Sequence, residues 1–185
     1  GNDLTIYHSG SDSYIRDIGT GSLYIEGENA VNIRSNSTSE SMAVFNSNSS
    51  VDLYYDSVKK FETTTNGIDV TGEVLADKAY IAETTLTDGA TINWDMSTQS
   101  VCKVTLGGNR TLAAPTNGST GQFASILVIQ DGTGSRTLTW NAVYEFASDT
   151  APTLTTTASL GDLFTFRYNG SKWLEVGRNQ ALTLS

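Results

Sequence analysis

The feature that most constrains the fold of this chain is an apolar side chain at every second position in one short segment after another. Segments 4–7, 23–26, 31–34 and 51–56 all alternate in this way, and stretches rich in Ser, Gly and Asn separate them. Side chains of a β-strand point alternately to its two faces, so a period of two indicates half-buried strands. Strands at such regular spacing, joined by turns, predict an all-β fold.

The residue composition also favours strands over helices. Hydrophobic residues make up 38% of the 185 residues and charged residues 17%, both below the roughly 45–50% and 25% of ordinary globular domains. Ser, Thr, Asn and Gly fill the difference. Ser, Thr and Asn compete with the helix for backbone hydrogen bonds, and Gly makes helix formation costly in entropy.

Charge and cysteine content exclude several classes of protein. The formal net charge is -9, which repels phosphate and makes nucleic acid an improbable partner. No apolar run approaches the roughly 20 residues of a membrane span, so we expect no membrane insertion. The single cysteine, Cys102, excludes an intrachain disulfide and lies in the apolar run 101–104, which predicts a packed thiol. The start, Gly1-Asn2-Asp3, has neither an initiator Met nor a signal-peptide pattern, and we expect the parent protein to extend upstream.

Residues 1–84 are too thinly apolar to fold alone. Each expected strand offers two or three apolar side chains on one face, which cannot offset the roughly 1–2 kcal/mol per residue that ordering the backbone costs. Packing against identical copies, related by cyclic symmetry, would bury that stripe. We therefore expect a homotrimer in which residues 1–84 form an elongated, intertwined β-rich shaft or collar, although the pattern alone fits two chains as well as three. Residues 74–82 fit a strand or a short helix.

Residues 85–185 are denser in apolar and aromatic side chains and contain all three Trp residues. The near-continuous apolar run 123–129 is typical of a strand covered on both faces. Asn169-Gly170 between alternating segments predicts a hairpin with a two-residue turn, which would pair Phe166 with Trp173. We predict a β-sandwich or jelly-roll-like head over residues 85–185.

Side chains suited to sugar recognition gather in segment 131–146. An aromatic face contacts sugar C–H groups, planar polar groups bind hydroxyls, and loops on a rigid scaffold are where binding usually occurs. The alternative for Trp140 is a place in the core, because it ends the alternating strand 136–140. The candidate ligand-binding residues are Asp131, Arg136, Trp140, Asn141, Tyr144 and Glu145.

An enzymatic role finds little support in the sequence. Glycosidases use two carboxylates about 5–10 Å apart, and Asp149 with Asp162, or Asp131 with Glu145, are candidate pairs, but acidic residues are common enough for such pairs to arise by chance. The single histidine, His8, excludes a catalytic pair of histidines within one chain. In a trimer, three copies of His8 on the axis are the alternative to a surface histidine beside a turn. We expect no catalytic residue, no metal and no cofactor.

Several stretches resemble the tail-fibre and structural proteins of marine, cyanophage-like bacteriophages. The N-terminal stretches resemble a repeat of these proteins and its continuation: residues 3–17, 19–25, 51–56, 59–64 and 67–72. Two C-terminal stretches are similar to distal domains of phage fibres: residues 108–112 and 130–140. Together these stretches span most of the chain.

This resemblance implies a homotrimeric tail fibre or receptor-binding protein, located in the virion and exposed outside the cell. Its expected partners are further copies of itself, tail or baseplate proteins upstream, and a host-surface glycan such as lipopolysaccharide or another outer-membrane receptor. Two alternatives stay open at this point. One is a purely structural fibre or adaptor segment without receptor binding, and the other is a glycan-degrading tailspike.

Overall fold

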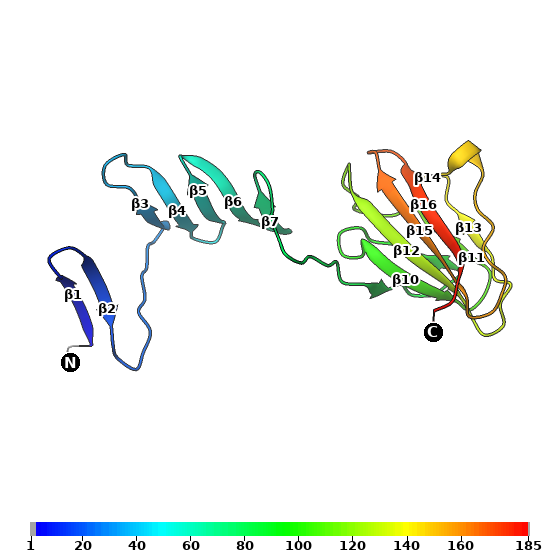
Figure 1. Cartoon of the computed structure of the whole chain (residues 1–185), viewed down its shortest axis with the longest axis horizontal. Helices are drawn as coiled ribbons and strands as arrows, with labels where there is room; N and C mark the ends of the chain where they lie inside the picture. Colours follow the sequence, from blue (N-terminus) through cyan, green and yellow to red (C-terminus); the bar gives the residue numbers. More distant parts are fainter. Residues whose placement is uncertain (1–2, 185) are drawn as a thin grey trace. The chain divides into compact units, whose positions relative to one another are not determined.

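Strands are the main regular structure of the chain, as the alternating pattern predicts. The computed structural model describes residues 3–184. Gly1 and Asn2, from which we expected the parent protein to extend upstream, lie outside the described residues, as does Ser185. Within 3–184 there is no α-helix, and the one helical turn is a 3-10 turn, η1 (Ala147–Asp149). The chain divides into two units, Gly1–Asp77 and Lys78–Ser185 (Figure 1).

The first unit contains a hairpin and a five-stranded antiparallel meander. In the hairpin, β1 (Leu4–His8) pairs with β2 (Ser13–Asp17), and Tyr7 stacks on Tyr14 at a centroid distance of 4.8 Å. The meander strands pair in chain order: β3 (Ala30–Arg34), β4 (Ser41–Asn46), β5 (Val51–Tyr55), β6 (Val58–Thr64) and β7 (Gly67–Val70). These strands follow from the predicted alternation at 4–7, 31–34 and 51–56.

The meander has one apolar face. Because directly paired residues point to the same side of a sheet, the register defines two apolar rows that cross the strands: Val31–Phe45–Val51 and Ile33–Ala43–Leu53–Phe61–Val70. Ile33, Phe45 and Leu53 keep 43–49% of their surface exposed. No second layer packs on this face within the part of the first unit that the structure describes, so the meander is a single sheet with one side uncovered.

The opposite face of the meander is polar. Asp52 is buried there and accepts hydrogen bonds from the Asn46 side-chain amide (3.2 Å) and the Tyr54 hydroxyl (3.4 Å). Lys59 lies 3.5 Å from Asp52 and 3.0 Å from Glu62. Charged and polar side chains satisfied in this way indicate the face that meets solvent, so the two faces of the sheet differ sharply in character.

Two segments predicted as regular structure have none. Residues 23–26 alternate like a strand but form no ladder, and residues 74–82 are neither strand nor helix. A strand needs a neighbour to accept and donate its backbone hydrogen bonds, and the described chain offers none beside these segments. Their apolar side chains are among the most exposed in the molecule, with Leu75 at 100% and Tyr80 at 82%.

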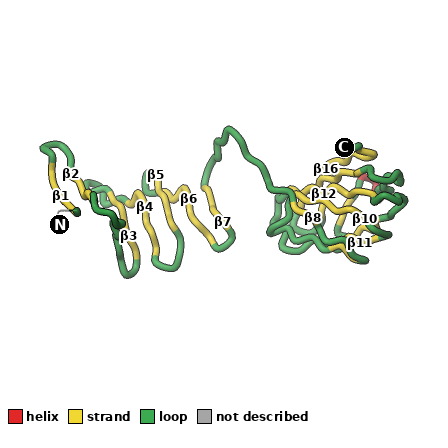
Figure 2. The backbone as a smooth tube through the Cα atoms, turned by 90° about the horizontal axis from the view of Figure 1, so that it is seen from below, coloured by secondary structure: helices red, strands yellow, loops and turns green. Residues whose placement is uncertain are grey.

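The second unit is a sandwich of two sheets (Figure 2). Most of its neighbouring strands pair in parallel. The chain passes from one sheet to the other and back, so that β8, β10 and β12 run parallel in the larger sheet and β9, β11 and β13 run parallel in the smaller one. The antiparallel strands β15 and β16, with β14 beside β16, complete the larger sheet. This winding differs from the antiparallel Greek keys of a jelly roll, because successive strands of each sheet enter from the same end.

The strand bounds in the second unit are as follows. The larger sheet contains β8 (Thr84–Thr85), β10 (Val101–Leu106), β12 (Phe123–Gln130), β14 (Tyr144–Glu145), β15 (Gly161–Tyr168) and β16 (Trp173–Leu182). The smaller sheet contains β9 (Thr91–Ile92), β11 (Arg110–Leu112) and β13 (Leu138–Trp140).

The core of the second unit lies between the two sheets. Every second residue of β10, β12 and β15 points inward, against Ile92, Leu112 and Leu138 of the smaller sheet. Trp94 and Trp173 are buried and stack at 6.5 Å. The Cys102 thiol is buried, as predicted, and burial raises its pKa to about 12.

Two details of the predicted head are wrong. Strand β12 is not covered on both faces: Ala124, Ile126 and Val128 are buried, while Phe123 on the other face is 56% exposed. The hairpin of β15 and β16 has a loop of four residues rather than two, so Trp173 pairs with Tyr168 and not with Phe166. The Asn169 carboxamide oxygen stabilises the longer turn, because it accepts hydrogen bonds from the backbone N–H groups of Ser171 and Lys172, at 2.9 and 2.7 Å.

Candidate functional site

Strand direction gives the second unit two distinct ends. The chain enters at β8, and because β8, β10 and β12 are parallel, all three strands begin at this entry end. The turns that follow them therefore gather at the opposite end, where the loop 150–160 joins them through a bond from Ser135 N–H to the Thr156 carbonyl (2.8 Å). We refer to residues 87–90, 107–109, 131–137 and 150–160 as the turn cluster.

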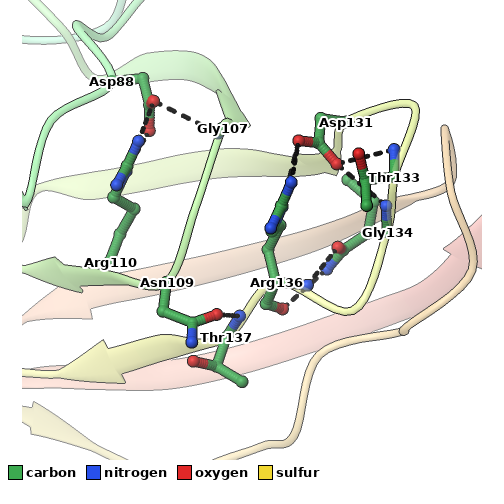
Figure 3. A network of polar contacts seen from close by, with 10 residues as sticks. Asp88, Gly107, Asn109, Arg110, Asp131, Thr133, Gly134, Arg136 and Thr137 are labelled. Carbon is green, nitrogen blue, oxygen red and sulfur yellow. Dashed lines mark hydrogen bonds and ion pairs between the residues drawn. The ribbon is translucent and has the colours of Figure 1, made fainter.

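Side chains lock neighbouring turns of the cluster together (Figure 3). Arg110 donates two hydrogen bonds to the Asp88 carboxylate, at 2.8 and 2.6 Å, and the Gly107 N–H donates a third at 3.2 Å. The Arg110 hydrogen bonds lower the pKa of Asp88 below its ordinary value. The next pair of turns is joined where the Thr137 N–H donates to the Asn109 side-chain oxygen, at 3.1 Å. These contacts fix the turns in register.

Asp131 and Arg136 form the most elaborate turn of the cluster (Figure 3). Arg136 donates to Asp131 Oδ2 at 3.0 and 2.7 Å, and the N–H groups of Thr133 and Gly134 donate to Oδ1, both at 2.9 Å. The Arg136 hydrogen bonds, followed by that of Gly134, lower the pKa of Asp131 to about 2. Gly134 has a φ of +76°, and a Cβ there would lie 2.5 Å from the Thr156 carbonyl oxygen, so the turn requires glycine. The guanidinium is therefore held in a fixed plane.

Arg136 also lines a small hollow in the turn cluster. The hollow has a volume of about 200 Å3, and its lining combines a guanidinium, hydroxyls and apolar side chains: Arg136, Thr137, Leu138, Pro152, Thr153, Leu154 and Thr156. A planar cation beside hydroxyl donors and a small apolar floor is chemistry that suits a hydroxyl-rich or acidic ligand.

Trp140 and Tyr144, two of the predicted ligand-binding residues, pack in the core. The Trp140 ring meets Tyr144, Phe146 and Phe164 edge-on, at centroid distances of 5.4, 5.2 and 4.9 Å. Tyr144 is 5% exposed and its hydroxyl donates to the Ala113 carbonyl at 3.1 Å. Burial raises the pKa of Tyr144. Tyr144 is thus buried, and Trp140 is half-buried against the same core.

Asn141 and Glu145 lie at the entry end of the unit, away from the turn cluster. The Asn141 side-chain oxygen accepts the Val143 N–H at 3.0 Å, and Glu145 forms an ion pair with Lys172 at 3.4 Å. The structure thus places the six predicted residues at two ends of the unit: Asp131 and Arg136 contact each other in the turn cluster. Trp140 contacts Tyr144 in the core, and Asn141 and Glu145 lie beside them. A ligand-binding role for the six stays a prediction.

Sequence reasoning missed the loop that completes the hollow. Pro152, Thr153 and Thr156 are close to Arg136 in space but at least 16 residues away along the chain. The run of threonines at 153 and 155–157 is the only local signal, and in a Thr-rich chain it does not stand out.

We predict that the Asp131 ion pair makes stability fall in acid. The pKa of Asp131 in the folded chain, about 2, lies below the ordinary value of 3.8, so its contribution is complete above pH 4 and is lost as the pH falls from 3.8 towards 2. The difference in Tm between the native chain and Asp131→Asn should therefore be largest at neutral pH and vanish near pH 2. Asp149→Asn, which removes a carboxylate outside the turn cluster, is the control. An Asp131→Asn difference that is independent of pH would contradict the assignment.

Comparison with known protein families identifies the second unit. Residues 84–173 match the family described as "Putative phage tail fibre C-terminal domain". The second unit is a phage tail fibre domain. The tail fibre domain begins at β8, reaches the first residue of β16, and includes the whole turn cluster.

Membership of this family makes the tail fibre chain a component of the virion tail. No curated protein matches the chain. No helix in residues 3–184 is long and apolar enough to span a bilayer.

Proposed function

We propose that the chain is a distal segment of a homotrimeric tail fibre, which links the virion mechanically to the host and recognises a host-surface glycan. The observation that carries this proposal is the uncovered apolar face of the meander in the first unit. A soluble monomer rarely exposes a contiguous apolar patch of this kind, and a single sheet needs packing on one face to be stable. Copies of the same chain supply that packing, and three copies around an axis give a fibre.

Receptor binding is assigned to the turn cluster. Strand direction puts this cluster at the end of the tail fibre domain opposite to the entry of the chain. Its backbone is fixed by Asp88–Arg110 and Asp131–Arg136, which keeps the hollow preorganised. The ordered guanidinium and the threonine hydroxyls favour a glycan with acidic or phosphorylated groups, such as lipopolysaccharide. Several weak sites acting together would give the fibre its avidity.

We propose a binding protein rather than a glycan-degrading tailspike. Asp131 is held as a carboxylate by Arg136, and Glu145 lies at the opposite end of the unit, so this pair is not arranged as the two carboxylates of a glycosidase. In the other candidate pair, Asp162 is buried, and its carboxylate accepts a hydrogen bond from the Thr155 backbone N–H at 2.7 Å. A purely structural segment without receptor contact is the remaining alternative, and it would leave the hollow without a ligand.

Arg136→Lys tests the assigned site. It retains the charge but loses the planar, bidentate fork, so we expect binding to a lipopolysaccharide or glycan array to weaken by about tenfold or more. Arg34→Lys, in the first unit, is the matched control and should bind like the native chain. Unchanged binding by folded Arg136→Lys would remove the turn cluster as the receptor site, and binding to no glycan at all would favour the structural alternative.

A further inference from the structure

The larger sheet of the tail fibre domain has an outer face that combines several large apolar side chains with the hydroxyl groups of Ser125 and Thr165, which pair with each other. Register places directly paired residues on the same side, so the row Lys103–Leu127–Leu163–Asn179 points outward, as do Phe123 and Ile129 along β12. Leu184 joins them near the C-terminus: a Cβ built on Gly161 would lie 3.0 Å from both Leu127 and Leu184. Phe123 and Val176 are 56% and 58% exposed. We refer to these outward side chains of β10, β12, β15 and β16, together with Leu184, as the outer face.

The outer face of the smaller sheet is different. Its three strands present Thr91, Thr111 and Thr139, which pair directly with one another and are all exposed. Hydroxyl groups on short side chains are well solvated, so this side of the sandwich is suited to water. The large exposed apolar side chains of the sandwich thus lie on the outer face of the larger sheet, and not on these strands of the smaller one.

The size of the outer face fits a protein interface. Four strands at roughly 4.8 Å spacing, and the eight residues of β12 at about 3.3 Å rise, span about 20 by 25 Å. The projected area is on the order of 500 Å2, and the accessible area of a face with protruding side chains is larger. A stable interface buries roughly 800 Å2 on each partner, so this face approaches what one needs.

The charge pattern favours a second copy of the chain as the partner. The chain has a net charge of -9, so copies repel one another wherever carboxylates face each other. The outward positions of β10, β12, β15 and β16 contain no acidic residue. Lys103, the cation near the middle, is paired with Glu83 at 2.6 Å, and Arg167 lies at the end of β15 beside Phe123. Apart from Glu83, which is paired with Lys103, this surface therefore has no carboxylate to oppose that of another copy.

We infer that the outer face is where copies of the tail fibre domain pack against each other, with the same face of every copy turned towards a common axis. The inference rests on the proposed fibre, because association through the first unit holds the domains at high effective concentration. Even a weakly self-complementary face would then be occupied. Phe123, exposed in the single chain, becomes covered, which explains why β12 is apolar on both of its sides. The threonine face stays in solvent.

Cross-linking of full-chain variants with one added surface cysteine tests this arrangement. Leu163→Cys puts a thiol near the middle of the outer face, and Thr111→Cys puts one at the middle of the threonine face. The native Cys102 is buried and serves as an unreactive background. With a short bismaleimide at micromolar chain concentration, Leu163→Cys is expected to give a band of twice the monomer mass on a denaturing gel, and Thr111→Cys is expected to give none.

The light-scattering mass of each variant separates the two proposals. If the variants are multimers and Leu163→Cys cross-links no better than Thr111→Cys, the outer face is not the contact and the fibre proposal stands. If the native chain is a monomer, the fibre proposal fails and the inference fails with it. Cross-linking of Leu163→Cys alone, in a multimeric chain, supports both.

Discussion

Trp140→Ala is expected to lower the free energy of unfolding of the tail fibre domain by roughly 3–5 kcal/mol, the usual cost of truncating a large core aromatic. Trp140 meets four aromatic rings, those of Tyr144, Phe146, Phe164 and Phe166, at 4.9–5.9 Å. Its removal leaves a cavity at the centre of this cluster that the two sheets cannot close. Because a domain of this size is stable by only about 5–15 kcal/mol, the loss should be evident as a large fall in the urea midpoint.

Two further variants show whether Trp140 acts as core or as a ligand contact. Its indole N–H is buried without a hydrogen-bond partner in the described structure, so Trp140→Phe removes an unpaired donor and keeps an aromatic ring; we expect it to cost much less than Trp140→Ala. Tyr80→Ala, which removes an 82% exposed ring, should leave the midpoint unchanged. A Trp140→Ala chain with native stability and lost glycan binding would restore the surface role predicted from the sequence.

Leu53→Asp is expected to abolish association of the first unit. Leu53 lies in the middle strand of the meander, between Ala43 and Phe61 on the apolar face. If that face packs against other copies, each copy would bury a carboxylate without a partner, at a cost of several kcal/mol per chain. Association should therefore weaken at least about 100-fold, and light scattering should report a monomer at micromolar concentration.

Asn32→Asp is the matched control for Leu53→Asp. Asn32 belongs to the same sheet but pairs with Val44, on the opposite face, so the added charge is the same while its surroundings are water. This variant should keep the mass of the native chain. Equal masses for Leu53→Asp and the native chain would mean that the apolar face is not the site of association.

The strands of the fold could be predicted where a strand neighbour lies nearby in sequence. Alternation located β1, β3 and β5 because each pairs with the next segment along the chain through a short turn. The same alternation at 23–26 produced no strand, since periodicity describes side chains and not the backbone partner that a strand requires. Likewise Asn169-Gly170 marked the hairpin correctly, but the extra bonds to the Asn169 side chain set a longer loop and shifted the register.

The geometry of the candidate site could be predicted only in part, for a related reason. Asp131 and Arg136 are five residues apart and share one turn, so a local pattern could find them. In the sequence, Trp140 and Tyr144 were equally good candidates for ligand contacts. Whether these side chains are buried depends on which strands the smaller sheet packs against, and the parallel pairs of that sheet join segments about 20 to 28 residues apart. The loop 150–160 reaches Arg136 only because the chain, after β14, runs alongside β16 to the end of the unit where β15 begins. No local signal carries that information.

The mass of the native chain in solution, measured by light scattering on residues 1–185, tests the central claim most directly. A fibre of three copies predicts three times 19.8 kDa, and this mass should hold down to micromolar concentration, because packing between copies buries the apolar face of the single sheet in the first unit. A folded, monodisperse monomer of 19.8 kDa would contradict the account, since it would show that this face is stable in water.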